Sequence, residues 1–337
     1  MADFAMPPRV PVALLPTRIE RIARFGERLR GVEVWMKRDD LTGYLLSGNK
    51  IRKLEFSFAR ALAGGADAVV TCGGVQSNHC RATAGLAARL GLGCDLFLRT
   101  PDGNPPEKLQ GNTLLDAILG ARIHWIDPDA YAARDALLSR HCEEEGLRGR
   151  KVYSIPEGAS DGVGALGYVN AALEIKEQLE AKNVSIDYVV HPIGSGGTSA
   201  GLAAGRDQFG AKWRVLGIPV CDDAAYFAAR IREIRTELTQ LFHLPETDDP
   251  AGGVELVDGY QGRGYGLTTP EELRWYHEFA RDEGILLDPC YTGKAFYGLY
   301  REIESGRIPE GSRILFLHTG GVFANFSYDE WGQVLSG

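Results

Sequence analysis

The chain has 337 residues, enough for about two domains, and its 44% hydrophobic and 24% charged residues are ordinary for a globular protein. A formal net charge of −8 argues against general binding to nucleic acid or anionic membranes, which requires clustered Lys and Arg. Six scattered cysteines without zinc-type spacing, no signal-peptide pattern and no apolar run of about 18 residues predict a cytoplasmic protein with reduced thiols, no metal site and no membrane span.

Short apolar runs alternate with helical stretches along the chain. We expect strands at 68–72, 188–190 and 314–317, and helices over 50–63, 81–90, 161–179 and 271–282. Segments 101–106 and 248–253 are rich in turn residues and are expected to be loops. This order predicts an α/β fold whose parallel sheets are covered by helices on both faces. Because ligands bind beyond the carboxyl ends of such strands, the glycine turns that follow the three strands are predicted to face one cleft.

The first candidate for chemistry is Lys50, which follows a glycine turn at the start of a predicted helix. A helix N-terminus disfavours a positive charge, and burial lowers the pKa of an amine further. A partly neutral lysine is what Schiff-base chemistry requires. A lysine in such a position is more often simply solvated, so Lys50 alone does not establish a function.

The second candidate is a strand–loop–helix segment, Gly73-Gly74-Val75-Gln76-Ser77-Asn78-His79. Ser and Asn are common helix caps, and capping alone would explain them. The same geometry offers free N–H groups and a helix dipole to a carboxylate, which Gln76, Ser77 and Asn78 would orient with neutral donors. His79 is open to three interpretations, as a base, a cleft-lining residue or a structural histidine.

The third candidate is the loop Gly194-Ser195-Gly196-Gly197-Thr198, again between a strand and a helix. Its successive N–H groups and hydroxyls suit one phosphate group. It lacks the Gly-Lys-[Ser/Thr] of a P-loop and the third glycine of GxGxxG. Asp222 and Asp223 stand at about the distance of a ribose-binding acid, so a nicotinamide dinucleotide remains an alternative ligand.

Two further segments carry single candidates, Tyr291 in Asp288-Pro289-Cys290-Tyr291-Thr292-Gly293-Lys294 and Thr319 in His318-Thr319-Gly320-Gly321. Tyr291 is interpreted as an acid/base, a wall of the cleft or a buried structural residue. Thr319 would donate to a ring nitrogen or cap the turn. A hydrolase is disfavoured, because no Gly-x-Ser-x-Gly stands as a nucleophile elbow in the right strand–turn–helix setting and no paired-carboxylate motif stands out.

In this order the segments resemble the pyridoxal-phosphate (PLP) enzymes of the tryptophan-synthase-β structural type, also called fold type II. More narrowly, the chain resembles the D-cysteine desulfhydrase and 1-aminocyclopropane-1-carboxylate (ACC) deaminase family over about residues 10 to 325. The segments that carry this resemblance are Lys37-Arg38-Asp39-Asp40, Gly48-Asn49-Lys50-x-Arg52-Lys53-Leu54-Glu55, Gly74-Val75-Gln76-Ser77-Asn78-His79-x-Arg81, Asp288-Pro-x-Tyr291-x-Gly-Lys294 and His318-Thr-Gly-Gly321.

The resemblance implies two domains, each with an open, twisted, mostly parallel sheet flanked by helices, and an active site in the cleft between them. The large PLP-binding domain would comprise 1–51 and 159–337, and the small domain 52–158. Family members are usually homodimers, so a homodimer acting on a small amino acid is expected.

The resemblance also implies a role for each candidate. Lys50 would hold PLP covalently, the 194–198 loop would bind its phosphate, Asn78 would lie near its phenolic oxygen, and Thr319 would face the pyridine nitrogen. Gln76, Ser77, Asn78 and His79 would receive the substrate. The catalytic set would be Lys50, Ser77, Tyr291 and Tyr265, the last within Gly264-Tyr265-Gly266.

Two positions separate the chemistries within the family. ACC deaminases typically carry Glu after the Tyr and Leu between the His and the Gly-Gly, whereas this chain has Thr292 and Thr319. Both match the desulfhydrase pattern, although Ser47 replaces the family's usual glycine. The expected reaction is β-elimination of D-cysteine to pyruvate, hydrogen sulfide and ammonia, in which Lys50 removes the Cα proton and the thiolate leaves.

Three alternatives stay open. The first is an L-cysteate sulfo-lyase, which keeps the cofactor and releases sulfite. The second is a nucleotide-binding dehydrogenase that uses the 194–201 loop and does not need Lys50. The third is a PLP-binding carrier protein without turnover. ACC deamination is the least favoured enzyme reaction within the family.

Overall fold

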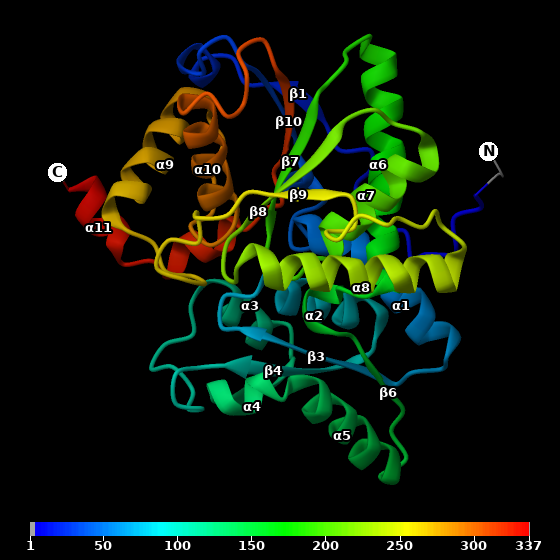
Figure 1. Cartoon of the computed structure of the whole chain (residues 1–337). Coiled ribbons are helices and arrows are strands. Elements are labelled where there is room, and N and C mark those ends of the chain that lie inside the picture. The colour runs from blue at the N-terminus through cyan, green and yellow to red at the C-terminus, as the bar shows by residue number, and fades with distance from the viewer. Residues whose placement is uncertain (1–3, 337) are drawn as a thin grey trace.

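The computed structural model describes residues 4–336, whose strands form two separate sheets (Figure 1). The larger sheet has six strands in the order β1-β2-β10-β7-β8-β9. All neighbouring pairs are parallel except β1 and β2. The strands are β1 (Ile19–Arg21), β2 (Glu33–Lys37), β7 (Tyr188–Ile193), β8 (Arg214–Pro219), β9 (Val254–Leu256) and β10 (Arg313–Leu317).

Helices cover both faces of the larger sheet because its central strands are apolar on both sides. In β10, Leu315 and Leu317 belong to one hydrophobic cluster, while Ile314 and Phe316 belong to the other. The first cluster includes residues of α6 (Gly162–Lys182), α7 (Gly197–Phe209) and α8 (Ala224–Phe242). The second includes residues of η1 (Phe25–Arg28), α9 (Pro270–Glu283) and α10 (Thr292–Glu304), and α11 (Glu330–Leu335) packs on α9.

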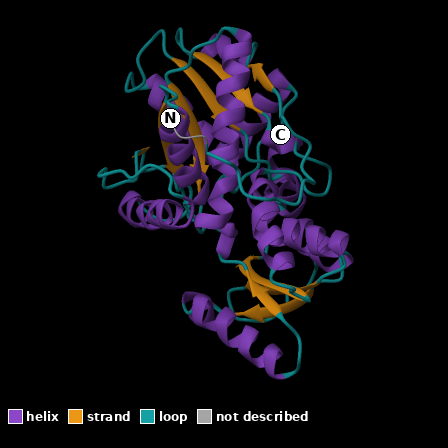
Figure 2. Cartoon of the chain, turned by 90° about the vertical axis from the view of Figure 1, so that its right-hand side faces the viewer, coloured by secondary structure: helices purple, strands orange, loops and turns teal. Residues whose placement is uncertain are grey.

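The smaller sheet has four parallel strands in the order β5-β4-β3-β6, seen at the bottom of Figure 2. They are β3 (Ala68–Gly74), β4 (Gly93–Arg99), β5 (Arg122–Ile126) and β6 (Val152–Ser154). One face packs on α1 (Asn49–Ala63) and α2 (Asn78–Leu90), and the other packs on α4 (Pro128–Ala132) and α5 (Arg134–Leu147). Helix α3 (Gly111–Ile118) lies against α2.

The α/β fold with two mostly parallel sheets is therefore confirmed, as are the strands and helices expected above. Segments 101–106 and 248–253 contain neither helix nor strand. The exact domain limits stay a prediction, and helix α1 spans the limit at 51/52: its Phe56 packs in a cluster of the larger sheet, whereas its Leu54 and Phe58 pack with the smaller sheet.

Within residues 4–336, no helix combines the length and the apolar character needed to cross a membrane.

Candidate active site

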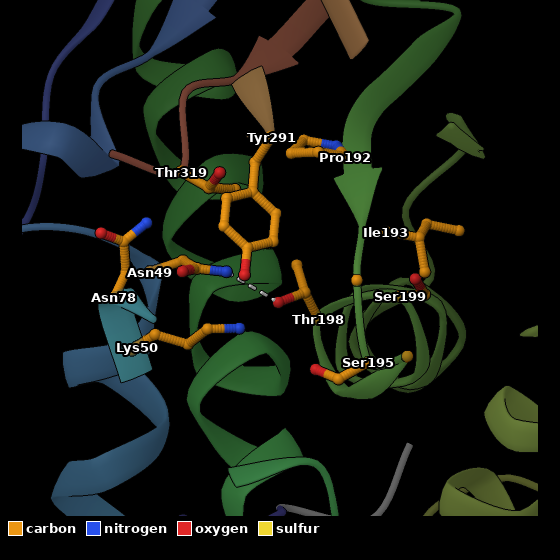
Figure 3. Close-up of a pocket in the computed structure, with 12 residues that line it drawn as sticks. Asn49, Lys50, Asn78, Pro192, Ile193, Ser195, Thr198, Ser199, Tyr291 and Thr319 are labelled. Carbon is orange, nitrogen blue, oxygen red and sulfur yellow. Dashed lines mark hydrogen bonds between the residues drawn. The ribbon is translucent and has the colours of Figure 1, made fainter. Parts of the chain in front are cut away.

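Residues from the segments that follow β3, β7 and β10 meet at one cavity between the two sheets, although only the segment after β7 lines it with glycines. Lys50 and Tyr291 lie in the wall of this cavity (Figure 3). Asn78 comes from the segment after β3, Gly194 to Thr198 from the segment after β7, and Thr319 from the segment after β10. The complete lining is Asn49, Lys50, Asn78, Pro192, Ile193, Gly194, Ser195, Gly196, Thr198, Ser199, Tyr291 and Thr319.

Lys50 is the second residue of α1, and a glycine sets the entry of the chain into that helix. Gly48 has φ +103°, and a Cβ there would lie 2.9 Å from the carbonyl oxygen of Thr319. The N–H of Asn49 donates to the same oxygen over 3.0 Å. Glycine thus permits an approach that brings the β10 loop against the start of α1.

A buried ion network anchors this helix. Arg52 donates two hydrogen bonds of 2.8 Å to Asp39 and two of 2.9 Å to Glu174. Lys37 also donates to Glu174, over 2.5 Å. Arg52 and Asp39 are 1% or less exposed. The Lys37-Arg38-Asp39-Asp40 motif therefore holds the beginning of α1 in place rather than lining the cavity.

Burial of the Lys50 amine lowers its pKa from 10.5 to about 8, while the charge of Glu157 acts in the opposite direction. With this pKa about one tenth of the amine is neutral at pH 7, far more than for an ordinary lysine. In Figure 3 its side chain points into the space between Asn78, Ser195 and Thr198. The lowered pKa of Lys50 and its place in the first turn of α1 agree with the prediction of a partly neutral lysine at the start of a helix.

The loop after β7 forms a cradle for an anion. Gly196 caps α7 with φ +84°, and the first N–H groups of this 13-residue helix face the cavity end of the loop. Ser199 Oγ is buried without a hydrogen-bond partner among the described residues. A Cβ at Gly197 would lie 2.6 Å from Lys53 Nζ, so glycine keeps this approach open.

Lys53 and Ser160 extend the cradle, although neither was among the residues predicted for the site. Lys53 Nζ donates to Ser160 Oγ over 2.8 Å, and Ser160 Oγ lies 2.7 Å from Ser195 Oγ. Lys53 is fully buried, and burial, together with the charge of Lys50, holds its pKa well below the ordinary value. A buried lysine amine whose hydrogen-bond partner is a hydroxyl fits a site completed by an anion, because the anion's charge would raise this pKa and favour the ammonium form. The sequence could have pointed to Lys53 through its spacing, because a residue three positions after Lys50 lies on the same face of the helix.

The predicted substrate segment is only partly at the cavity. Asn78 lines it, and its Oδ1 accepts a hydrogen bond of 2.9 Å from Asn112. Ser77 is the N-cap of α2 and accepts from the N–H of Cys80. Gln76 turns toward another loop: it accepts from the N–H of Asn112 over 2.9 Å and donates to the carbonyl of Gln110 over 3.0 Å.

His79 lies inside the smaller domain's core rather than at the cavity. Its Nε2 is 2.8 Å from Thr71 Oγ1, and the ring is 2% exposed. Burial holds its pKa well below the ordinary value, so the ring is neutral. The cavity lining does not include Gln76, Ser77 or His79, and their substrate-binding roles stay predictions.

The two tyrosines meet at the mouth of the cavity. The hydroxyl oxygens of Tyr265 and Tyr291 are 2.6 Å apart, with the rings edge to face. Burial holds the pKa of both phenols well above the ordinary value. Tyr291 lines the inner cavity, whereas Tyr265 lines a wider cleft that shares Gly194 and Ser195 with it. The buried Asp288 accepts from the N–H groups of Cys290, Tyr291 and Thr292 and so orders the Tyr291 loop.

A lysine of lowered pKa that faces a glycine-rich anion cradle between two parallel sheets defines a PLP-dependent enzyme of fold type II. The chain belongs to the pyridoxal-phosphate-dependent enzyme family, which matches residues 10–320. It is a PLP-dependent lyase, and PLP is its cofactor. The cradle, with its unpartnered Ser199 hydroxyl and the buried amine of Lys53, fits the phosphate group of this cofactor.

Two relatives are similar over nearly the whole chain. A Thermotoga maritima protein, named provisionally as an ACC deaminase, is 42% identical over 321 residues, which cover 95% of this chain and 98% of the relative. The mitochondrial bifunctional D-cysteine desulfhydrase/ACC deaminase of Arabidopsis thaliana is 40% identical over 334 residues, covering 96% of this chain and 80% of the relative.

Solved structures agree with this assignment. The crystal structure of an ACC deaminase homologue is 38% identical, with a TM-score of 0.87 and coverage of 98% of this chain and 96% of that one. O-ureido-L-serine synthase, at 18% identity and a TM-score of 0.68, covers 95% of this chain and 94% of its own and shows the shared fold.

Proposed function

We propose that the chain catalyses β-elimination of D-cysteine to pyruvate, hydrogen sulfide and ammonia. The observation that carries this proposal is the lining of the inner cavity, which holds no carboxylate among the described residues. Thr319 is part of this lining. Thr292, at the position where ACC deaminases carry Glu, donates to Asp288 over 2.6 Å.

A cavity without a carboxylate favours elimination of a good leaving group over a reaction in which negative charge must be held on the substrate for longer. When bound, PLP supplies the electron sink for charge developing at Cα of the substrate. A hydroxyl at Thr319 would stabilise a protonated ring nitrogen less than a carboxylate would. Prompt loss of a thiolate from Cβ needs less of this stabilisation than opening of a cyclopropane ring.

The start of α2 receives the substrate carboxylate in this proposal. Ser77 caps this 13-residue helix, and Asn78 lies at the cavity. The helix N-terminus stabilises the carboxylate through free N–H groups and the dipole. This contact orients the substrate so that its Cα faces Lys50.

Lys50 and the tyrosine pair move the protons. The amine of Lys50, whose pKa is about 8, takes the proton from Cα as a general base. Tyr291 keeps its proton at neutral pH because burial raises its pKa, and it donates this proton to the departing sulfur. Tyr265, 2.6 Å away, hydrogen-bonds to the Tyr291 hydroxyl and holds it in place.

The test is a substrate comparison with purified, PLP-loaded protein. D-cysteine, L-cysteine, L-cysteate and ACC are supplied separately, and oxo acid, sulfide and sulfite are measured. Pyruvate and sulfide from D-cysteine, abolished in Lys50→Ala, are the expected result. The names of the two relatives make ACC a necessary comparison. Faster release of 2-oxobutanoate from ACC than of pyruvate from D-cysteine would contradict the proposal.

One observation favours L-cysteate as a second candidate substrate. Arg99 ends β4 beside Gly74, with its guanidinium carbon 4.6 Å from the Tyr131 ring centre and 5.9 Å from that of Tyr265. It lines the wider cleft and makes no side-chain ion pair with residues 4–336. A cation without a counter-ion at this place suits a sulfonate on Cβ.

The cysteate candidate has its own test. Arg99→Gln should lower kcat/KM for L-cysteate about 10- to 100-fold, mainly through KM, because a charge-assisted hydrogen bond is lost. The rate with D-cysteine should change little. Equal losses with both substrates would instead show that Arg99 only supports the tyrosine rings that it contacts.

A further inference from the structure

The loop that carries Tyr265 lacks regular structure of its own. Residues 257–269 contain neither helix nor strand. The four glycines of this loop have positive φ, namely Gly259 (+96°), Gly262 (+61°), Gly264 (+111°) and Gly266 (+70°). Such a segment has high conformational entropy, so contacts from elsewhere must determine where Tyr265 lies.

Lys294 supplies the strongest of these contacts. Its Nζ donates to the carbonyl oxygens of Gln261 and Gly264, both over 2.6 Å. The side chain is 1% exposed, and within residues 4–336 no carboxylate forms an ion pair with it. Burying an ammonium with only carbonyl partners is costly. We therefore attribute the burial of Lys294 to its two hydrogen bonds with this loop.

A second hydrogen bond holds the other side of Tyr265. The hydroxyl of Tyr328, which follows η4 (Val322–Ser327), donates to the carbonyl of Gly266 over 2.6 Å. Carbonyls on both sides of Tyr265 are therefore fixed from helix α10 and from the C-terminal segment. Tyr265 itself reaches Tyr291, 2.6 Å away between hydroxyl oxygens.

The two tyrosines and Lys294 form one unit because Tyr291 is the N-cap of α10 and Lys294 is the third residue of that helix. We propose that Lys294 is a positioning residue that aligns the Tyr265 hydroxyl with that of Tyr291. This inference rests on the role proposed above for the tyrosine pair. It adds that the first turn of α10 both presents one tyrosine and fixes the loop of the other.

A double-mutant cycle on the PLP-loaded enzyme tests the coupling. Lys294→Met and Tyr265→Phe are each expected to lower kcat for D-cysteine by up to about 100-fold, with a smaller change in KM. The double variant should be no slower than Tyr265→Phe, because Lys294 acts through that side chain. Multiplicative losses would show an independent structural role and overturn the proposal.

A second measurement does not depend on turnover. Backbone hydrogen exchange of residues 257–269 should speed up in Lys294→Met, while α2 and the 194–198 loop keep the exchange of the parent protein. The matched control is Lys176→Met, since Lys176 forms only a surface ion pair with Glu180. Unchanged exchange in the Tyr265 loop would overturn the proposal even if no tested substrate reacts.

Two further variants keep the test decisive if Lys294→Met does not fold. Tyr328→Phe removes only the hydrogen bond to Gly266, and a smaller acceleration of exchange confined to the same loop is expected. Lys294→Arg keeps a cation at this position, so its loop exchange and its kcat should lie between those of Lys294→Met and the parent. If exchange in the loop of Tyr328→Phe equals that of the parent, the hydrogen bonds to Gln261, Gly264 and Gly266 do not hold this loop, and the proposal is overturned. If the parent protein turns over no tested substrate, only the proposed function is contradicted.

Discussion

Lys53 Nζ and Ser160 Oγ are 2.8 Å apart beneath the loop that follows β7. The two residues come from different elements, 107 positions apart in the chain. Ser160 also accepts from the N–H of Gly197 over 3.3 Å. Helix α1, which bears Lys50, is thereby tied directly to the anion cradle, so the lysine and the phosphate site keep a fixed spacing.

The first prediction concerns cofactor affinity. Lys53→Met should raise the Kd for PLP about 10-fold or more, because a buried cation near the phosphate is lost while Lys50 remains. Titration of apoprotein with PLP, followed by the visible absorbance of the bound cofactor, measures this. Lys182→Met, at an exposed position, is the control. Equal affinity in the two variants would show that Lys53 does not act on the cofactor.

The second prediction concerns the pH dependence of cofactor attachment. Only the neutral amine of Lys50 reacts with the aldehyde of PLP, and its pKa is about 8. The rate of attachment to apoprotein should therefore rise about tenfold per pH unit below 8 and level off above it. Nα-acetyl-lysine, whose amine has a pKa near ~10.4, should show the same rise continuing to higher pH. A protein rate that keeps rising to pH 10 would contradict the lowered pKa.

Much of the fold could be predicted from local pattern. The apolar runs at 188–190 and 314–317 lie in β7 and β10, and residues of the segments after both strands line one cavity. Lys50 and Thr319 were found because a motif at a strand or helix end needs no knowledge of distant residues. Local sequence signals were sufficient to find a site residue where it lies at the end of a helix or strand.

Other parts of the site depend on contacts between distant segments. The hydrogen bond between Gln76 and Asn112 joins residues 36 positions apart, and that between Lys294 and Gln261 joins residues 33 positions apart. No periodicity or turn signal marks such pairs, since each partner is unexceptional in its own segment. The same reason explains why Ser160 was missed.

The third prediction concerns stability. Asp39→Asn should lower the free energy of unfolding by about 3–5 kcal/mol at pH 7, because the buried Arg52 and Lys37 would then share a single carboxylate, that of Glu174. Burial alone would raise the pKa of Asp39, but Arg52 outweighs this and holds it below the ordinary value. The stabilisation is thus present above the unfolded-state pKa, about 3.9, and is lost as the pH falls below it. Urea unfolding at pH 7 and at about pH 3 should show a smaller difference between parent and variant at the lower pH. Asp129→Asn, at an exposed position, is the control. If the difference in unfolding free energy between parent and Asp39→Asn does not change with pH, the stabilisation does not come from the charge of Asp39.

The fourth prediction separates backbone strain from steric exclusion at the start of α1. Gly48 and Gly65 both have positive φ, +103° and +69°, but only at Gly48 would a Cβ meet another segment, 2.9 Å from the oxygen of Thr319. Gly65→Ala should therefore cost only about 1–2 kcal/mol of stability, the strain of the left-handed backbone, and leave PLP binding unchanged. Gly48→Ala should cost more and also weaken PLP binding, because the loop bearing Thr319 must move away from Lys50. Unfolding by urea and PLP titration of both variants measure the two effects. If Gly48→Ala binds PLP as tightly as Gly65→Ala, the close approach of these two loops does not shape the cofactor site.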